Sequence, residues 1–516
     1  MFKWLNSRKK KSQTSSAAIH PSEVRPLTSS LQRNLQVVRE QIGHSPDVIF
    51  RQFSFCGTLW KAAIVYIDGL VDKTALHEQI MKPLMQEPTA AEKAKQLSDG
   101  AAHIKNWVIN SGIPIAEIKE AHNLNDCILE VLSGNALLFI DGIDSGFILG
   151  ITGWEGRSID EPVTESLVRG PRDGFVETLR NNTAMLRRRI KDPNFTMVVY
   201  KVGQRAKKDL AIVYIKGIAN EELVAEVKRR VERINIDDVP ESGYVEQLIE
   251  DNYLSPFPQV QNTERPDRVM SALMEGRVAL LLDGTPFALI VPVTFSMLMS
   301  SPEDYYERWL PGSLIRAMRY GATFTALFLP ALYISLISYN QGLIPTKLAI
   351  SIAATREGVP FPSLIEALMM EVIIEILREA GVRLPKPVGQ AVGIVGGLVI
   401  GQAAVEAGIV SPIMVIVVAL TAISSFAFPQ YGAGIAIRML RFGMMMSAAV
   451  LGLYGVILFF ILINAHLVKL KSFGVHYTAS FTPYRPKDWK DMVIRAPLMM
   501  MKQRPEMNKT QDRKRQ

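Results

Sequence analysis

Two eight-residue phrases of this chain are nearly identical, although they begin 148 positions apart. AIVYIDGL occupies 63–70 and AIVYIKGI occupies 211–218, and each is followed by a helix-like stretch, DKTALHEQIMKPL or NEELVAEVKRRVE. Further along, NALLFIDGI at 135–143 is echoed in the same order by RVALLLDGT at 277–285. A self-similar period of this length indicates a duplicated subdomain rather than an array of short repeats.

The duplication predicts an α/β soluble N-terminal region made of two related subdomains, about 46–155 and 192–305. The repeated phrases alternate poorly between apolar and polar residues, which is typical of strands buried on both faces. We therefore expect 63–67 and 211–215 to be equivalent core strands. A helical linker over 156–191 should join the subdomains, with one helix starting near Pro162 and a second ending in the arginines 187–189.

The acidic residues that both copies retain do not indicate a catalyst. Asp141 and Asp283 are each followed by Gly, and Asp-Gly is primarily turn chemistry. Asp68 of the first phrase is Lys216 in the second, so it is not a shared acid. The chain has no phosphate-binding glycine loop, no H-E-x-x-H and no paired cysteine motif, and its seven histidines stand singly. We expect no enzyme activity, no cofactor and no metal site.

The net charge of +8 gathers at the two ends of the chain. Residues 1–33 hold seven basic and one acidic side chain, and residues 484–516 hold ten and four, so the body between them is acidic. A nucleic-acid partner is therefore not expected. We expect a basic, disordered tail over 1–45 and a second basic tail over 471–516. Anionic headgroups attract such segments by about 1 kcal/mol per Lys or Arg, and simple solvation is the alternative.

Four stretches without charge follow the soluble region, at 320–346, 387–405, 407–437 and 442–465. About 20 apolar residues are needed to cross a bilayer, so these stretches predict a multi-span helical membrane domain over 306–470. The segment 359–377 is long enough for a fifth span, but it contains three glutamates, which cannot face lipid. Counting Lys and Arg slightly favours five spans over four, and five would place the C-terminal tail on the far side.

Glu371, Glu375 and Glu379 follow i+4 spacing and share one helical face, while Glu366 points elsewhere. In a symmetric oligomer such a stripe would form rings of carboxylates, a common device of cation pathways. We therefore treat the three as candidates for pore lining. The alternative is an interfacial helix whose carboxylates pair with Arg378 and Arg383.

Glycines recur at every fourth position in VGQAVGIVGGLVIGQAAVEAG, namely at Gly389, Gly393, Gly397 and Gly401. Small residues at this spacing let two helix backbones approach closely. The stripe predicts tight helix–helix packing, either within one subunit or between subunits.

A family resemblance rests on EPVTES…RGPRDGFVETLRNN, on the duplicated region and on SFGVHYTASFTPYRPKDWKD. Over about 45–505 the chain resembles the A subunits of spore germination receptors, the GerA family. The resemblance implies a nutrient-sensing complex in the inner membrane of a bacterial endospore, with a transporter-like B subunit and a lipoprotein C subunit. It also implies homo-oligomers that pass ions when a germinant binds. No catalytic residues come with it.

Three alternatives remain open at this point. The F protein of the stage V sporulation operon shares this architecture and would form an auxiliary ion channel. A transporter subunit would need a midplane site in broken helices, commonly with internal repeats, and 343–356 is the one candidate break. An enzyme would need a clustered polar site in the soluble region. MFKWLNSRKKK has no apolar core behind its charges, so it is not a secretory signal, and the soluble region should stay on the cytoplasmic side.

Overall fold

The structure is a computed structural model that describes residues 26–55, 60–86, 100–153, 161–162, 164–384, 397, 399–479 and 481–515. It divides into two compact units. The first comprises residues 1–155 with 190–195, and the second comprises residues 156–189 with 196–516. The second unit therefore includes one soluble subdomain, the apolar helices and the C-terminal segment.

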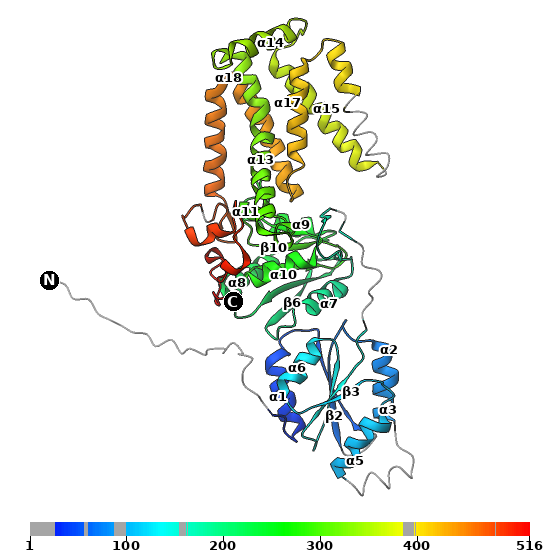
Figure 1. The fold of residues 1–516 in the computed structure, drawn as a ribbon. Coiled ribbons are helices and arrows are strands. Elements are labelled where there is room, and N and C mark those ends of the chain that lie inside the picture. The colour runs from blue at the N-terminus through cyan, green and yellow to red at the C-terminus, as the bar shows by residue number, and fades with distance from the viewer. Residues whose placement is uncertain are drawn as a thin grey trace, which may run out of the picture. The chain divides into compact units, whose positions relative to one another are not determined.

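The first unit is built on a five-stranded sheet of order β1-β2-β4-β5-β3. Its strands are β1 (Val48–Ser54), β2 (Lys61–Ile67), β3 (Ile118–Ala121), β4 (Ala136–Ile140) and β5 (Gly146–Leu149). One face carries α1 (Leu31–Ile42) and α6 (Leu124–Leu132) (Figure 1). The other face carries α2 (Lys73–Ala75), η2 (Leu76–Met81), α3 (Lys82–Met85), α5 (Gly100–Trp107) and η3 (Val108–Gly112).

The second unit repeats this sheet with the order β6-β7-β9-β10-β8. Its strands are β6 (Phe195–Val202), β7 (Lys208–Ile215), β8 (Gln261–Thr263), β9 (Val278–Leu282) and β10 (Ala288–Val291). The helices α7 (Leu179–Arg189) and α10 (Pro266–Met274) correspond to α1 and α6 by their place in the chain. The helices α8 (Glu221–Glu232) and α9 (Ser242–Ile249) pack their buried valines against the same core as β7 and β9.

The predicted equivalence of the repeated phrases is confirmed. Residues 63–67 lie in β2 and residues 211–215 lie in β7, and both are the second strand of a five-stranded sheet. Ala63 pairs with Phe139 as Ala211 pairs with Leu281. The pairing is antiparallel, and the strands are buried on both faces because helices cover both sides of each sheet.

The retained Asp-Gly pairs have the structural role that was predicted. Gly142 and Gly284 have φ of 83° and 88°, as the turn chemistry requires. Asp141 Oδ1 accepts a hydrogen bond from the backbone N–H of Leu31 (3.1 Å), and Asp283 Oδ1 accepts one from Leu179 N–H (3.0 Å). Each aspartate thus satisfies a free N–H at the start of α1 or α7.

Two boundaries predicted from the sequence are wrong. Residues 31–42 form α1 and pack into the first subdomain through Leu31, Leu35, Val38 and Ile42, so the segment 1–45 is not a disordered tail throughout. Of the two helices predicted for the linker 156–191, the first is absent, since the described residues 164–178 contain no helix. The second, ending in the arginines 187–189, is present as α7 (Leu179–Arg189), but it belongs to the second subdomain.

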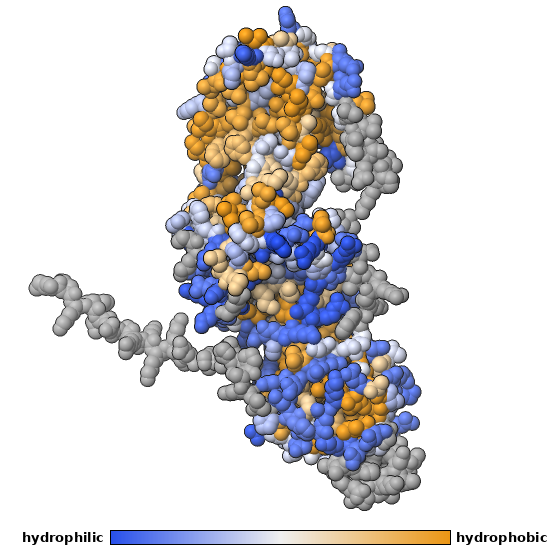
Figure 2. All heavy atoms as spheres, viewed as in Figure 1, coloured by the Kyte–Doolittle hydropathy of each residue, from blue (hydrophilic) through white to orange (hydrophobic). Residues whose placement is uncertain are grey.

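The apolar part of the second unit begins after α11 (Phe295–Leu298) and α12 (Glu303–Tyr306). Its helices are α13 (Trp309–Ser338), η4 (Gln341–Leu343), α14 (Thr346–Arg356), α15 (Ser363–Arg383), α17 (Pro412–Ser425) and α18 (Tyr431–Lys469), and residues 399–406 are also helical. Hydrophobic residues cover this region (Figure 2). By length and composition, α13 and α18 could each cross a membrane.

The α18 helix is a hairpin of two antiparallel legs rather than one rod (Figure 1). Gly452 breaks the helix with φ 61° and ψ −143°. Gly443 faces Phe459, where an added Cβ would lie 2.6 Å from the ring, and Gly455 faces the carbonyl group of Ser447. In a straight helix those partners would lie on different turns about 12 Å or more apart. The prediction of a single span over 442–465 is therefore wrong, because the chain reverses inside that stretch.

Both ends of the apolar region lie at the same soluble subdomain. Gln430, before the first leg of α18, donates to the carbonyl oxygen of Asn262 (3.3 Å), and His466 at the end of the second leg lies 2.9 Å from the hydroxyl of Ser255. The start of α13 contacts the C-terminal segment, as described below. This return to one end fits an even number of spans better than the five that Lys and Arg counting favours, and the number of spans stays a prediction.

The C-terminal segment 471–515 is a folded part of the second unit and not an extended tail. It contains β11 (Lys471–Ser472), β12 (Val475–His476), η5 (Pro486–Lys490), η6 (Leu498–Met500) and η7 (Glu506–Asn508). Tyr477 is fully buried and donates its hydroxyl to the carbonyl oxygen of Pro258 (2.8 Å). Its basic residues did not reveal this packing, because the contacts are made with residues far away in the sequence.

Candidate functional site

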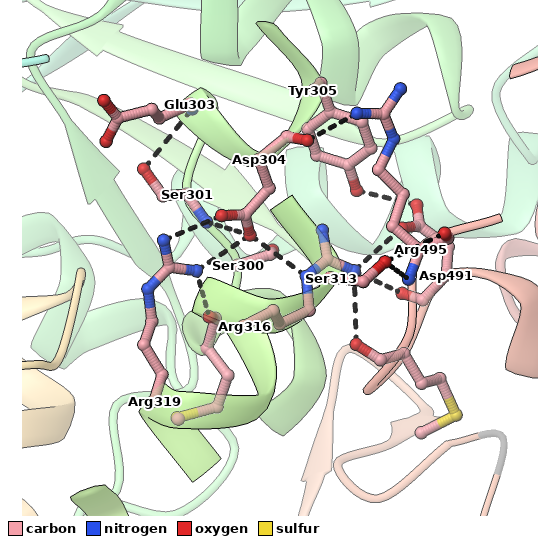
Figure 3. A network of polar contacts seen from close by, with 12 residues as sticks. Ser300, Ser301, Glu303, Asp304, Tyr305, Ser313, Arg316, Arg319, Asp491 and Arg495 are labelled. Carbon is pink, nitrogen blue, oxygen red and sulfur yellow. Dashed lines mark hydrogen bonds and ion pairs between the residues drawn. The ribbon is translucent and has the colours of Figure 1, made fainter. Parts of the chain in front are cut away.

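A buried ionic network holds the first turns of α13 (Figure 3). We call it the α13 anchor and define it as Asp304, Arg316, Arg319, Asp491 and Arg495. Asp304 of α12 is 2% exposed. Arg319 donates to both of its oxygens, through Nη1 at 2.8 Å and Nη2 at 2.7 Å, and Arg316 Nε donates at 3.0 Å. Because Arg316 and Arg319 are three residues apart, they share one face of α13.

The C-terminal segment completes the anchor. Asp491 accepts from Arg316 Nη1 (2.8 Å) and from the hydroxyl of Tyr305 (2.6 Å). Arg495 donates to the carbonyl oxygen of Asp304 (2.5 Å). Burial and the charge of Asp491 raise the pKa of Tyr305 well above its ordinary value, so the phenol remains a hydrogen-bond donor. The anchor therefore ties α12, α13 and the C-terminal segment to one another.

This network is a mechanical joint rather than a reactive centre. Arg316 and Arg319 pair with the two carboxylates, whereas Arg495 donates to the backbone carbonyl oxygens of Asp304 and Glu307. Removing one partner of a buried pair leaves an uncompensated charge, which costs about 3–5 kcal/mol. The anchor thus couples the position of α13 strongly to the soluble subdomain from which Asp304 projects.

A second set of contacts binds the linker to the same place. We call residues 164–173 the strap. Glu165 of the strap accepts from the hydroxyl of Thr263 (2.5 Å) and from Arg268 Nη1 (2.7 Å). Arg268 also donates to the carbonyl oxygen of Ser300 (3.0 Å), just before α12. One guanidinium group therefore joins the strap to the segment that carries Asp304.

The strap is fixed at its other end as well. Arg265, which is fully buried, donates to the carbonyl oxygen of Pro171 (2.6 Å). Tyr306 of α12 donates its hydroxyl to Asp267, and its ring lies against Gly170 of the strap. The strap is thus held against Arg265 and α10 on one side and against α12, which carries Asp304, on the other.

The predicted pore-lining residues lie on α15, and the structure places two of them against α18. Glu371 is fully buried and pairs with Arg441 at 2.7 Å. Glu375 is partly buried and pairs with Arg378 at 2.8 Å and with Arg441 at 3.3 Å. In the single chain these carboxylates are therefore neutralised by arginines, and the predicted pairing with Arg378 is present.

The other two glutamates of α15 lie elsewhere. Glu379 is exposed and pairs with Arg383 at 2.6 Å, which is the second pairing that the interfacial alternative predicts. Glu366 is buried near the opposite end of α15, where it pairs with Arg356 (2.7 Å) and accepts from the backbone N–H of Ser411 (2.9 Å). The expectation that Glu366 points away from the stripe is confirmed.

The glycine stripe is only partly within the described residues. Gly389 and Gly393 lie outside them. Among the described residues, a Cβ on Gly397 would meet no atom within 4 Å outside its own helix, and one on Gly401 would make an ordinary 3.4 Å contact with Val415. Close packing of this stripe stays a prediction.

The sequence did not reveal the α13 anchor, although one signal was present. Arg316 and Arg319 directly precede the uncharged stretch, where the sequence alone indicates only the cytoplasmic end of a span. Arginines three residues apart on an otherwise apolar helix face require buried acidic partners, but nothing local identifies Asp304 or Asp491. Among the described residues, no group of three His, Cys, Asp or Glu side chains could hold a metal ion.

Comparison with known proteins gives consistent matches. The family model described as Bacillus/Clostridium GerA spore germination protein matches residues 36–507. Spore germination protein B1 of Bacillus subtilis is 46% identical over 95% of this chain and 99% of its own length. Spore germination protein GerLA of Bacillus cereus is 44% identical over 94% of this chain and 97% of its own. The solved N-terminal domain of the A subunit of the Bacillus megaterium spore germinant receptor GerK3 is 37% identical, covering 53% of this chain and 98% of that one, with a TM-score of 0.41.

Proposed function

This chain belongs to the Bacillus/Clostridium GerA family of spore germination proteins, and we propose that it is the A subunit of a nutrient germinant receptor. It acts in the inner membrane of the endospore, together with a transporter-like B subunit and a lipoprotein C subunit. The names of its relatives, which match it over nearly their full length, support this assignment. We assign it no enzymatic activity.

The observation that carries the proposal is the α13 anchor. The anchor and the strap converge on α12, so a displacement of the soluble subdomain reaches α13 through Asp304. A long helix held at its first turns by buried ion pairs transmits such a displacement as a stiff lever. The chain therefore works as a relay that passes a binding event to the membrane.

The apolar helices of the second unit would cross the membrane. The α13 helix and the two legs of α18 are each about 25–45 Å long, which approaches or exceeds the thickness of a hydrocarbon core. An even number of passes keeps the subdomain and the C-terminal segment on one side, which we assign to the spore core. The basic residues at that end, among them Arg308, Lys469 and Lys471, support this orientation.

A homo-oligomer of the chain would form the cation pathway. The outer face of α15 is apolar at Ile365, Val372 and Ile376, which leaves it free for a second copy. Glu371 and Glu375 lie behind that face, paired with arginines, and would contribute negative charge to the pathway once α15 moves away from α18. When the pathway opens, Glu371 and Glu375 would leave their arginine partners in the same chain. The carboxylates of neighbouring copies would then form rings around the pathway.

Charge-neutralising substitutions test the pathway. Spores carrying Glu375→Gln should assemble normal amounts of receptor and release monovalent cations more slowly on nutrient addition, because each subunit loses one negative charge. Glu406→Gln is the matched control, since Glu406 is exposed and contacts only Gln402 among the hydrogen bonds seen for it. Normal cation release from both Glu371→Gln and Glu375→Gln spores would show that the pathway runs elsewhere.

Nutrient recognition would lie mainly outside this chain. The described part of the apolar region shows ion pairs that are already satisfied, and the transporter-like partner offers the more suitable pocket. Calorimetric titration of the purified chain with amino acids and sugars should detect no tight binding. Tight binding by this chain alone would contradict the division of labour between subunits.

A further inference from the structure

Three aromatic rings of the C-terminal segment form an exposed cluster. Trp489 packs edge-on against Phe481 with ring centroids 5.4 Å apart, and against Tyr484 with centroids 5.6 Å apart. The three side chains are nevertheless 45%, 44% and 69% exposed, respectively. Aromatic side chains that pack on one another and stay this open have a surface to offer to a partner.

The cluster is held at the soluble end of the apolar helices by contacts on both sides of it. Before it, Tyr477 N–H donates to the carbonyl oxygen of Leu470, directly after the second leg of α18. After it, Asp491 pairs with Arg316 of α13. Asp491 lies two positions after Trp489, a reach of about 7 Å. Arg316 in turn lies four residues before the uncharged stretch that begins at Tyr320, about 6 Å along the helix.

Exposed lysines stand next to the cluster in the chain. Lys469 ends α18, Lys471 begins β11 and Lys490 follows Trp489 directly, whereas Asp488 precedes Trp489 and the neighbouring Asp491 is paired with Arg316. Trp and Tyr favour the headgroup level of a bilayer, where the ring is partly apolar and its polar group stays wet. Lysines beside them add attraction to anionic lipid.

We propose that Phe481, Tyr484 and Trp489 form an interfacial anchor that inserts between lipid headgroups, with Lys469, Lys471 and Lys490 binding anionic phosphate groups. The proposal rests on the membrane crossing proposed above. Because Asp491 belongs to the α13 anchor, the lipid contact is coupled to the position of α13. The surface charge of the membrane would thereby influence the position of α13, the helix that the soluble subdomain also displaces.

Depth-dependent fluorescence quenching tests the proposal on the full chain. The chain is reconstituted in vesicles of phosphatidylcholine and phosphatidylglycerol that carry a nitroxide either near the headgroup or near the end of the acyl chain. Subtracting the signal of Trp489→Phe from that of the unsubstituted chain isolates Trp489. We expect its emission to be quenched about twofold more by the shallow label than by the deep one. Trp107→Phe is the control, because Trp107 packs on Phe55 inside the first unit.

The lysines are tested in the same vesicles. The combined variant Lys469→Gln, Lys471→Gln and Lys490→Gln should reduce the shallow quenching of Trp489 to the level found in phosphatidylcholine alone. Quenching of Trp489 by aqueous iodide without any effect of the lipid labels would overturn the proposal in favour of a ring facing water. Protection from both iodide and lipid labels would overturn it in favour of a protein partner.

The experiment distinguishes an error in the proposed interfacial anchor from an error in the proposed membrane crossing. Flotation of the vesicles after an alkaline wash reports on crossing, since helices that span the bilayer resist that treatment. A chain that floats while Trp489 is quenched only by iodide crosses the membrane without an interfacial anchor. A chain that is washed off does not cross, and both proposals then fall.

Discussion

Replacing Asp304 with Asn is the most direct test of the α13 anchor. The carboxylate is 2% exposed and accepts three short hydrogen bonds from guanidinium groups. Asn keeps the shape but removes the charge, so Arg319 loses its only ion pair among the described residues, while Arg316 keeps Asp491. A buried charge left without its partner costs about 3–5 kcal/mol. We therefore expect a destabilisation of that size in the second unit.

The assay is thermal unfolding of the full chain in lipid nanodiscs, followed by tryptophan fluorescence. At about 2–4 °C per kcal/mol for a unit of a few hundred residues, Asp304→Asn should lower the midpoint by roughly 6–20 °C. Glu303→Gln is the matched control on the same helix, because the Glu303 carboxylate makes one exposed contact with Val168 N–H at 3.3 Å. Equal midpoints for the two variants would refute the reasoning that the anchor is a strong joint.

Thermal unfolding of the Asp304→Asn, Arg319→Met double variant and of both single variants measures the interaction energy between Asp304 and Arg319. If the two groups stabilise each other, the double variant should be less destabilised than the sum of the single variants, by up to about 3 kcal/mol. Additive effects would mean that the two side chains act independently.

Three further predictions concern the strap, the hairpin and pH. Glu165→Gln should weaken a buried charge-assisted bond to Arg268 and make trypsin cut the strap about tenfold faster; an unchanged cutting rate would contradict the seating of the strap. Gly452→Ala should cost about 1–3 kcal/mol, because φ 61° with ψ −143° is nearly exclusive to glycine, whereas Gly358→Ala, with open space around it, should leave the unfolding midpoint unchanged. Burial, helped by Glu250 and Glu241, raises the pKa of Glu246 from 4.5 to about 8. The folded state thus holds a proton that the unfolded state releases, so stability should fall as pH rises from 5 to 8, with a slope below about 1.4 kcal/mol per pH unit that Glu246→Gln removes.

The amino-acid sequence by itself determined the duplicated α/β region. Both copies of the apolar segment must be buried, and a run of consecutive apolar residues is enough to predict a strand that is buried on both faces. Local chemistry also determined the Asp-Gly turns at Asp141 and Asp283. The sequence also showed that the carboxylates of α15 would be unfavourable in contact with lipid. The free energy needed to remove a carboxylate from water depends on the carboxylate itself and not on its partner.

Only the tertiary structure decided which partners those charges have and how the apolar helices run. Glu371 is neutralised by Arg441, and Asp304 by Arg316 and Arg319, across turns that no periodicity predicts. Gly452 reverses the chain inside a uniformly apolar stretch, where composition carries no mark of a turn. A pattern of apolar residues specifies how much surface must leave water, but the same area can be buried by several arrangements. The choice among them depends on long-range contacts, such as that between Asp491 and Arg316, that form only when the chain has folded.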